Sequence, residues 1–302
     1  MRKLIASLFA LVIAAGLLAG CGSSESSSSS SSTTSTSSST TIPAQSVNST
    51  IAATVPASFK SKGTLVVGTE AQYAPNEFIE NSQIVGMDPD LMKAIGEIIG
   101  LKTQLQEAQF TGIIPGIQSG KYDVGASSFT INAEREKVVQ FVSYFKAGIS
   151  FFAKKGSNPG VETIADLCGK TVAVEKGTVE AEEVEKQNKK CKEEKKSEIK
   201  AEVFPGQSEV NLALSSGRAQ VAMADSPVAA YQVKQSNGGF ELVGKSYEFA
   251  PYGFALKKGA GLAKPIQEAL KELIANGTYM KILEKWGVQE GAINDPQIHP
   301  AE

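Results

Sequence analysis

Few residues of this chain are arranged for covalent catalysis. The single histidine, His299, lies near the C-terminus beside Pro300, which makes a histidine-based catalytic triad implausible. The sequence contains no phosphate-binding glycine loop of the Walker or dinucleotide type and no G-x-S-x-G elbow. Its 32 acidic residues offer many carboxylate pairs, but no spacing singles out one of them.

A polar run at residues 127–135 has the chemistry of a binding site for a small anion. It reads SSFTINAER, so the hydroxyls of Ser127, Ser128 and Thr130 precede the guanidinium of Arg135. A guanidinium is a planar fork that matches a carboxylate with two hydrogen bonds. The backbone N–H groups at Thr178, in an expected strand-to-helix turn, would reach the same anion. An arginine after a loop is more often a solvated surface residue, and the run alone leaves that alternative open.

A second polar residue has the opposite role in this interpretation. Asp225 follows another expected strand, where its carboxylate would accept hydrogen bonds from an ammonium group. A clamp for a carboxylate on one loop and an acceptor for an ammonium on another describe a site for an α-amino acid.

These side chains must be positioned by alternating strands and helices. Apolar runs predict buried strands, and apolar residues at helical spacing predict helices. A charged stretch of mixed sign predicts a solvated helix face. The expected strands cover residues 64–68, 139–153 and 170–175, and the expected helices cover residues 90–99, 110–119, 180–200 and 266–286, the last broken at Asn276 and Gly277.

One local pattern occurs twice. Residues 119–125 (SGKYDVG) are echoed by residues 216–222 (SGRAQVA), and each copy joins an apolar helical stretch to a short strand and a polar loop. In α/β folds, ligands bind outside the carboxyl ends of the strands. The echo therefore predicts two α/β lobes whose loops face each other, with chance similarity of two helix ends as the alternative.

The N-terminus has the features of an export signal. Residues 1–20 combine Arg2 and Lys3 with an apolar run too short for a membrane span, and they end before Cys21 in the LAGC pattern of a lipoprotein. An ordinary signal peptide with a stray cysteine is the alternative. Residues 21–56, rich in Ser and Thr, are expected to be a flexible tether, and folded sequence is expected to begin near Ala57.

Charge and cysteine content narrow the function further. Removing Arg2 and Lys3 from the 30 cations leaves 28 against 32 anions, a net charge of −4 without a basic stripe, which argues against nucleic acid as a partner. Cys168 and Cys191 are most simply a disulfide in an oxidising compartment. Zinc is the rival interpretation, but two cysteines without a nearby histidine are too few ligands.

From about residue 64 to residue 287 the chain resembles the extracytoplasmic solute-binding proteins of polar amino acid ABC importers. The matching motifs include LVVGT, YAP, GMDPDL, FTGIIP and SGKYD, and they continue through the polar run. Their positions are residues 65–69, 73–75, 86–91, 110–115, 119–123, 127–135, 169–174, 177–178, 252–255, 277–279 and 285–287.

The resemblance implies a two-lobed α/β fold that closes over one free amino acid. Lobe one would comprise residues 58–147 plus 252–302, and lobe two residues 148–251, with the crossings near residues 147–149 and 249–252. It also implies delivery to membrane permease subunits, no cofactor, no catalysis and a monomer. The lipid anchor expected at Cys21 from the LAGC pattern fits an outer membrane or the outer face of a single cytoplasmic membrane, and the Ser/Thr-rich tether and the cysteine pair favour the second. An extracytoplasmic dehydratase and a sensor subunit are the rival interpretations.

The resemblance also assigns roles to individual residues. Arg135 and Thr178 would bind the ligand carboxylate, and Asp225, Ser128 and Thr130 the ammonium. The remaining expected contacts are Glu70, Tyr73, Phe110, Ser127 and Phe129, of which Tyr73 and Phe110 would sandwich the side chain.

The pocket departs from the family pattern at Asn76, Asn132, Val179 and Glu180. Glu70 and Glu180 favour a basic amino acid, then glutamine or another polar neutral one, over an acidic one. The nearby Lys176 weakens that inference.

Overall fold

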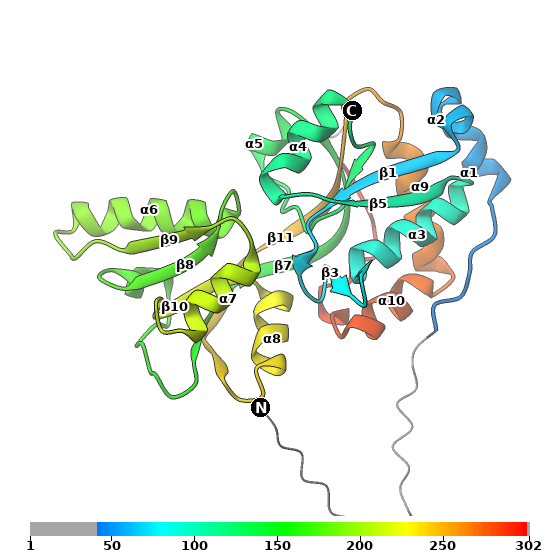
Figure 1. Ribbon diagram of the computed structural model, residues 1–302. Coiled ribbons are helices and arrows are strands. Elements are labelled where there is room, and N and C mark those ends of the chain that lie inside the picture. The colour runs from blue at the N-terminus through cyan, green and yellow to red at the C-terminus, as the bar shows by residue number, and fades with distance from the viewer. Residues whose placement is uncertain (1–40, 301–302) are drawn as a thin grey trace, which may run out of the picture. The chain divides into compact units, whose positions relative to one another are not determined.

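The computed structural model describes residues 41–300, shown as a ribbon in Figure 1. The expected signal peptide and the lipidated Cys21 lie outside the described residues. No helix in the described part is long and apolar enough to cross a bilayer.

The first half of the sheet is built on one buried parallel strand. β1 pairs on one side with β5 and on the other with β6, and both pairings are parallel. A small antiparallel sheet is inserted after β1. The elements of this half are β1 (Thr64–Thr69), β2 (Gln72–Tyr73), β3 (Glu77–Glu80), β4 (Gln83–Val85), α3 (Met87–Ile99), β5 (Lys102–Glu107), α4 (Phe110–Ser119) and β6 (Val124–Gly125).

The second half repeats this topology. β8 lies between β9 and β10 and is parallel to both, as β1 is to β5 and β6. The echoed segments occupy the same place in both halves, since one joins α4 to β6 and the other joins α7 to β10. The elements are β8 (Thr171–Glu175), α6 (Val179–Glu193), β9 (Lys200–Phe204), α7 (Gln207–Ser215) and β10 (Val221–Asp225).

Two long antiparallel strands connect the halves. β7 (Gln140–Lys154) and β11 (Phe240–Leu256) pair along most of their length. β11 also pairs with β6 and β7 with β10, so the order across the sheet is β5-β1-β6-β11-β7-β10-β8-β9. The pairing of β7 and β11 shifts register near Tyr247 and Ala250. The expected two-lobed fold is confirmed, and the predicted crossings fall in these strands.

Helices cover both faces of each half. In the first, the core of α3, α9 and α10 packs on one face and α4 on the other. In the second, α7 and α8 pack on one face and α6 on the other. The remaining elements are α1 (Ser49–Thr54), α2 (Ala57–Lys62), α5 (Ala133–Glu136), η1 (Ile164–Leu167), α8 (Ser226–Gln235), α9 (Ala263–Ala275), α10 (Thr278–Trp286), η2 (Gln289–Gly291) and β12 (Ile298–His299).

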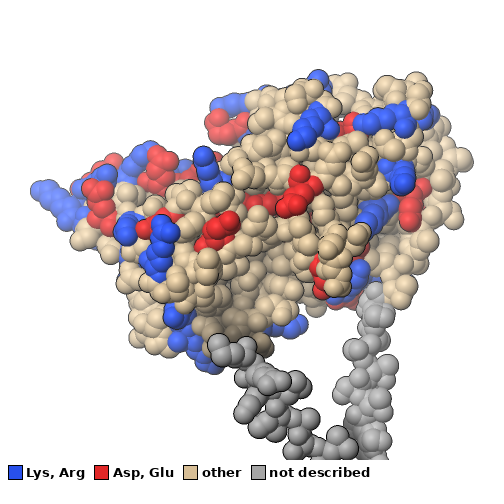
Figure 2. Space-filling view, viewed as in Figure 1, with Lys and Arg blue, Asp and Glu red and all other residues tan. Residues whose placement is uncertain are grey.

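Most predicted elements occur within a few residues of their expected ends. α4 has the predicted bounds, and α9 and α10 are separated at Asn276 and Gly277. The helix expected over residues 180–200 was predicted too long, because α6 ends at Glu193 and Lys200 begins β9. Figure 2 shows charges of both signs interspersed over α6, as the charge pattern indicates.

Folded structure begins earlier than predicted. Asn48 caps α1, its backbone N–H donates to Ile98 O (2.9 Å), and its amide donates to Glu272 (2.7 Å). Val55 is buried in the core of the first half. The expectation that folded sequence starts near Ala57 is therefore wrong, because a capping residue and a few apolar side chains attach this segment to α3 and α9.

Cys168 and Cys191 form a disulfide, as expected, between the end of η1 and α6. The bonded cysteines are 23 positions apart, and Cys191 is fully buried among the apolar residues beneath α6.

We predict that the double variant Cys168→Ser, Cys191→Ser has a free energy of unfolding lower by about 3 kcal/mol, because the unfolded chain regains the entropy of this loop. Denaturant unfolding of the oxidised protein and of the variant measures the difference. A reductant should destabilise the wild type and leave the variant unchanged; equal midpoints for both proteins would contradict the prediction.

Candidate functional site

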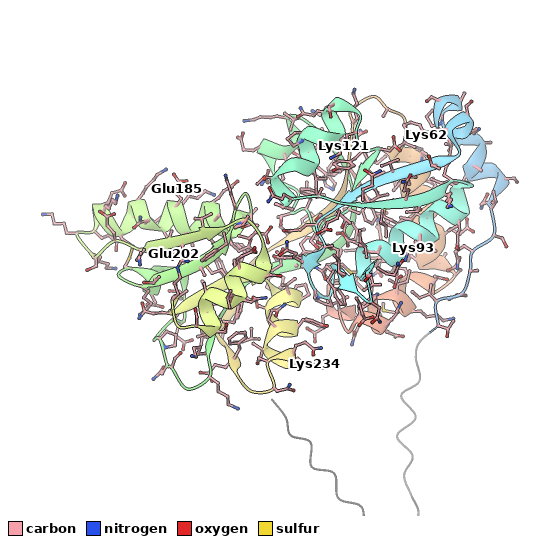
Figure 3. The ribbon with its side chains drawn as sticks, viewed as in Figure 1. Lys62, Lys93, Lys121, Glu185, Glu202 and Lys234 are labelled. Atoms are coloured by element: carbon pink, nitrogen blue, oxygen red, sulfur yellow. A yellow bond between two sulfur atoms is a disulfide. The ribbon has the colours of Figure 1, made fainter. Side chains whose placement is uncertain are left out.

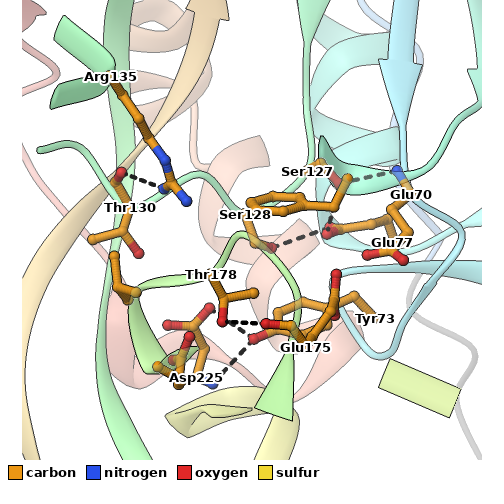
Figure 4. Close-up of a pocket in the computed structure, with 13 residues that line it drawn as sticks. Glu70, Tyr73, Glu77, Ser127, Ser128, Thr130, Arg135, Glu175, Thr178 and Asp225 are labelled. Atoms are coloured by element: carbon orange, nitrogen blue, oxygen red, sulfur yellow. Dashed lines mark hydrogen bonds between the residues drawn. The ribbon is translucent and has the colours of Figure 1, made fainter. Parts of the chain in front are cut away.

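A pocket lies where the carboxyl ends of two parallel strands of the first half face those of two parallel strands of the second half. Glu70 follows β1, Ser127 follows β6, Glu175 ends β8 and Asp225 ends β10. The space between its lining residues, open solvent at its mouth included, is ≈ 270 Å³. The lining residues, which Figure 4 shows converging from both lobes, are Glu70, Tyr73, Glu77, Phe110, Ser127, Ser128, Thr130, Arg135, Glu175, Thr178, Val179, Glu180 and Asp225.

Nine of the ten expected contact residues line this pocket. The tenth, Phe129, lies behind the wall, where its ring stacks on Phe110 with centroids 4.7 Å apart. The structure therefore brings the expected residues together, and their role in binding stays a prediction.

Arg135 is held firmly at the edge of the pocket. Its guanidinium donates to Thr130 O (2.7 Å) and, across the cleft, to Gly177 O (3.1 Å). The guanidinium carbon also lies 5.4 Å from the ring centroid of Phe110. Burial lowers the pKa of Arg135, whereas the nearby carboxylates raise it, and the group stays cationic at neutral pH.

Asn132, one of the departures from the family pattern, has a structural role here. Its side-chain oxygen accepts from the backbone N–H of Arg135 (2.9 Å) and caps α5. The residue three positions before the arginine thus fixes the backbone from which the guanidinium extends.

Thr178 is the N-cap of α6, and its neighbour Gly177 contacts the opposite lobe. Its hydroxyl accepts from Ala181 N (3.2 Å) and donates to Glu175 O (2.9 Å). Gly177 has φ +82°, and a Cβ there would lie 2.7 Å from Thr111 Cγ2 of lobe one. A glycine is therefore required for this close approach.

Tyr73 joins the two lobes through its hydroxyl. It donates to Asp225 Oδ2 (2.9 Å) and accepts from Asp225 N (3.1 Å). Burial raises the pKa of Asp225 to about 6, although the hydrogen bond from Tyr73 and the charge of Arg135 lower it. The predicted ammonium acceptor is thus buried and already oriented.

The pocket contains more acid than the sequence indicated. Five carboxyl groups line it beside the one guanidinium, and they come from Glu70, Glu77, Glu175, Glu180 and Asp225. Burial is the main cause that raises the pKa of Glu70 to about 7 and that of Glu180 to about 8. The charges of Glu209 and Glu107 add to the first shift and the charge of Asp225 adds to the second.

Glu70 and Glu175 meet across the cleft. Burial raises the pKa of Glu175 well above its ordinary value, and the charge of Glu70 raises it further. Both carboxylate oxygens of Glu175 and Glu180 Oε1 are buried and receive no hydrogen bond from a donor group of the described residues. These oxygens are free to accept hydrogen bonds from a cationic ligand.

Sequence reasoning missed Glu77 and Glu175. Glu175 did leave a signal, because it is a charged residue at the end of an apolar strand and two residues before Gly177. Glu77 lies in a short hairpin without such a pattern. Lys176, which weakened the inference from the acids, is exposed and does not line the pocket.

Within residues 41–300, no group of three or more His, Cys, Asp or Glu side chains has the arrangement needed to hold a metal ion.

The chain is similar in sequence and in structure to known proteins. Residues 65–289 match the model of the bacterial extracellular solute-binding proteins, family 3. The chain is 34% identical over 251 residues to the arginine-binding protein ArgT of Corynebacterium glutamicum, covering 82% of each. It is 31% identical to the glutamine-binding protein GlnH of Bacillus subtilis, covering 95% of this chain and 97% of GlnH. A solved ancestral arginine-binding protein bound to arginine is 42% identical with a TM-score of 0.69, over 74% of this chain and 98% of that one.

The buried acidic side chains of the pocket should make the stability of the ligand-free protein depend on pH. A carboxyl whose pKa is raised on folding binds more protons in the folded state, so stability falls as pH rises from the unfolded to the folded pKa. For Glu70, Glu180 and Asp225 that window extends from about pH 4 to about pH 8.

We therefore expect the thermal midpoint of the ligand-free protein to be higher at about pH 5 than at about pH 8, by several degrees. Glu175→Gln should flatten this slope, because one of the opposed carboxyls no longer ionises. Calorimetric scans of ligand-free protein measure both; a midpoint that rises over this interval would contradict the prediction.

Proposed function

The chain belongs to family 3 of the bacterial extracellular solute-binding proteins, and we propose that it captures a basic amino acid, arginine in the first place, for an ABC importer. The observation that carries the proposal is the excess of buried carboxyl groups in the pocket over the single guanidinium.

The charges of an arginine zwitterion balance those of the pocket. Its carboxylate would pair with Arg135 and its α-ammonium with Asp225. The side-chain cation would then meet Glu70, Glu175 and Glu180, because the five carboxyl groups of the lining exceed what the single guanidinium of Arg135 can balance. A neutral side chain would leave these carboxyls protonated or unpaired, and an acidic one would add repulsion.

The position of the acids favours a guanidinium over an ammonium. Glu70 and Glu175 approach from opposite lobes, and a guanidinium has five N–H donors in a planar fork that can bridge two carboxylates. A lysine ammonium is a compact charge with three donors. The likeness to arginine-binding relatives supports the same order of preference.

Binding and closure are coupled in this proposal. Arg135 and Tyr73 of lobe one already contact Gly177 and Asp225 of lobe two, so the structure has the contacts of a closed form. A ligand that bridges Glu70 and Glu175 would bind the closed form more tightly than the open one and shift the population toward it.

The closed protein would then deliver its ligand to permease subunits in the membrane. The lipoprotein pattern at Cys21 and the Ser/Thr-rich sequence after it support a lipid anchor on the outer face of the cytoplasmic membrane. An anchor of this kind raises the effective concentration of the receptor near its permease. We further propose that the protein acts as a monomer and does not convert its ligand chemically, as expected for transport.

Ligand preference is tested by isothermal titration calorimetry with the common amino acids. We expect arginine to bind at least roughly tenfold more tightly than glutamine, and lysine to lie between them. Glu175→Gln should weaken arginine binding by roughly tenfold or more, because a buried charge pair is lost, and should affect glutamine less.

Glu185→Gln is the matched control, since Glu185 lies exposed on α6, where Figure 3 labels it, and does not line the pocket. Its arginine affinity should equal that of the wild type. If glutamine or an acidic amino acid binds more tightly than arginine, the proposed preference is wrong.

Arginine binding should also release protons. The cation lowers the pKa of the raised pocket carboxyls, so affinity should increase from about pH 5 to about pH 8. Titrations at neutral pH in two buffers of different ionisation enthalpy measure the number of protons released. An affinity that is constant or decreases over this range would contradict the assignment of these acids to the cation.

A further inference from the structure

Two buried carboxyl groups of lobe one converge on Ser128, and the first of them, Glu77, also lines the pocket. Glu77 comes from β3 and Asp88 from the first turn of α3, and both residues are fully buried. Two buried carboxylates this close together repel each other, so their arrangement around one residue favours one proton on the pair.

This pair supports the backbone that carries the hydroxyls of the site. Ser128 N donates to Asp88 Oδ2 (3.1 Å), and Ser128 Oγ donates to Glu77 Oε2 (3.2 Å). Ser127 Oγ is 3.4 Å from Glu77 Oε1 and accepts from Glu70 N (2.9 Å).

The loop that contains Ser127 and Ser128 is held in an energetically unfavourable backbone conformation. Ser128 has φ +49°, a left-handed value that serine rarely adopts. Asn76, another departure from the family pattern, donates from its amide to Ser128 Oγ (2.9 Å). The hydrogen bonds of Glu77, Asp88 and Asn76 thus compensate the strain at Ser128.

The groups around the pair provide no countercharge. Tyr144 of β7 donates its hydroxyl to Asp88 Oδ2 (2.7 Å). The other titratable groups that act on the pair are Glu70 and Glu175, which are acids. The N-terminus of α3 favours one negative charge at Asp88 but cannot compensate two.

Burial therefore favours a neutral form of one partner. It raises the pKa of Asp88 to about 7 and that of Glu77 well above its ordinary value, with the charge of Asp88 as a further cause for Glu77.

We propose that Glu77 and Asp88 hold one proton between them and act as positioning residues for Ser127 and Ser128, so that ligand affinity decreases when this proton is lost. The proposal rests on the proposed function, because the affinity in question is that for the amino acid in the pocket.

Asp88→Asn provides the main test. An asparagine retains an oxygen for Ser128 N and Tyr144, and its amide can donate to Glu77 without a shared proton. The ratio of the wild-type dissociation constant for arginine to that of Asp88→Asn should increase by roughly tenfold between about pH 7 and about pH 9. Titration of the ligand's own ammonium affects both proteins equally and cancels in this ratio.

Two further variants separate positioning from folding. Asp88→Ala removes the acceptor of Ser128 N and should weaken arginine binding by roughly tenfold or more at every pH. Glu80→Gln, an exposed residue of the same strand as Glu77, should follow the wild-type profile throughout. If Asp88→Asn does not fold, Glu77→Gln is measured in its place, because its amide can donate to Asp88.

The outcomes distinguish this proposal from the proposed function. Parallel affinity profiles for the wild type and Asp88→Asn would overturn the shared proton and leave arginine binding intact. If the wild type binds no amino acid, the proposed function fails. The pair is then judged by the thermal midpoints of the ligand-free proteins, where the wild type should lose stability relative to Asp88→Asn between about pH 7 and about pH 9. Equal losses there would overturn the pair.

Discussion

The arrangement of the cleft depends on burying more carboxyl groups than one guanidinium can neutralise. A buried charge without a partner is costly, so these carboxyls must take up protons, bind a cation or separate. Glu70 and Glu175 approach each other from the two lobes, and burial together with the charge of Glu70 raises the pKa of Glu175 well above its ordinary value. The electrostatic state of the pocket and the separation of the lobes are therefore linked.

The repeated topology explains how these groups come to face each other. Each half has a central strand with parallel neighbours on both sides, and the long strands β7 and β11 join the halves. The loops at the carboxyl ends consequently meet in one cleft. Close contact there needs small or fixed groups, such as Gly177 against Thr111 and the Tyr73 hydroxyl on Asp225.

Local sequence patterns predicted most helices and strands and the polar residues of the site that follow strands, but only some of its acidic residues. Hydrophobic spacing located α4, β1 and β7 because their buried faces are local patterns. The end of α6 was missed because a run of charges continues past it with no change in composition. Arg135 and the hydroxyl run were found because they follow a strand, whereas Glu77 and Glu175 are significant only through partners distant in sequence.

Under the proposed function, the ionisation of the pocket carboxyls is coupled to the closing of the two lobes. This coupling adds selectivity for a cationic side chain beyond that of the direct contacts. With both Glu70 and Glu175 ionised, repulsion between the lobes favours the open form, and a cation placed between them reverses the sign of that interaction. An amino acid without a side-chain cation could still bind Arg135 and Asp225 through its carboxylate and ammonium. The lobes could then close over it only if Glu70 and Glu175 took up protons or stayed buried with unpaired charges. Discrimination thus arises from the cost imposed on the wrong ligand as well as from attraction of the right one. Under the proposed function, the form presented to the permease is the form that only a suitably charged ligand stabilises.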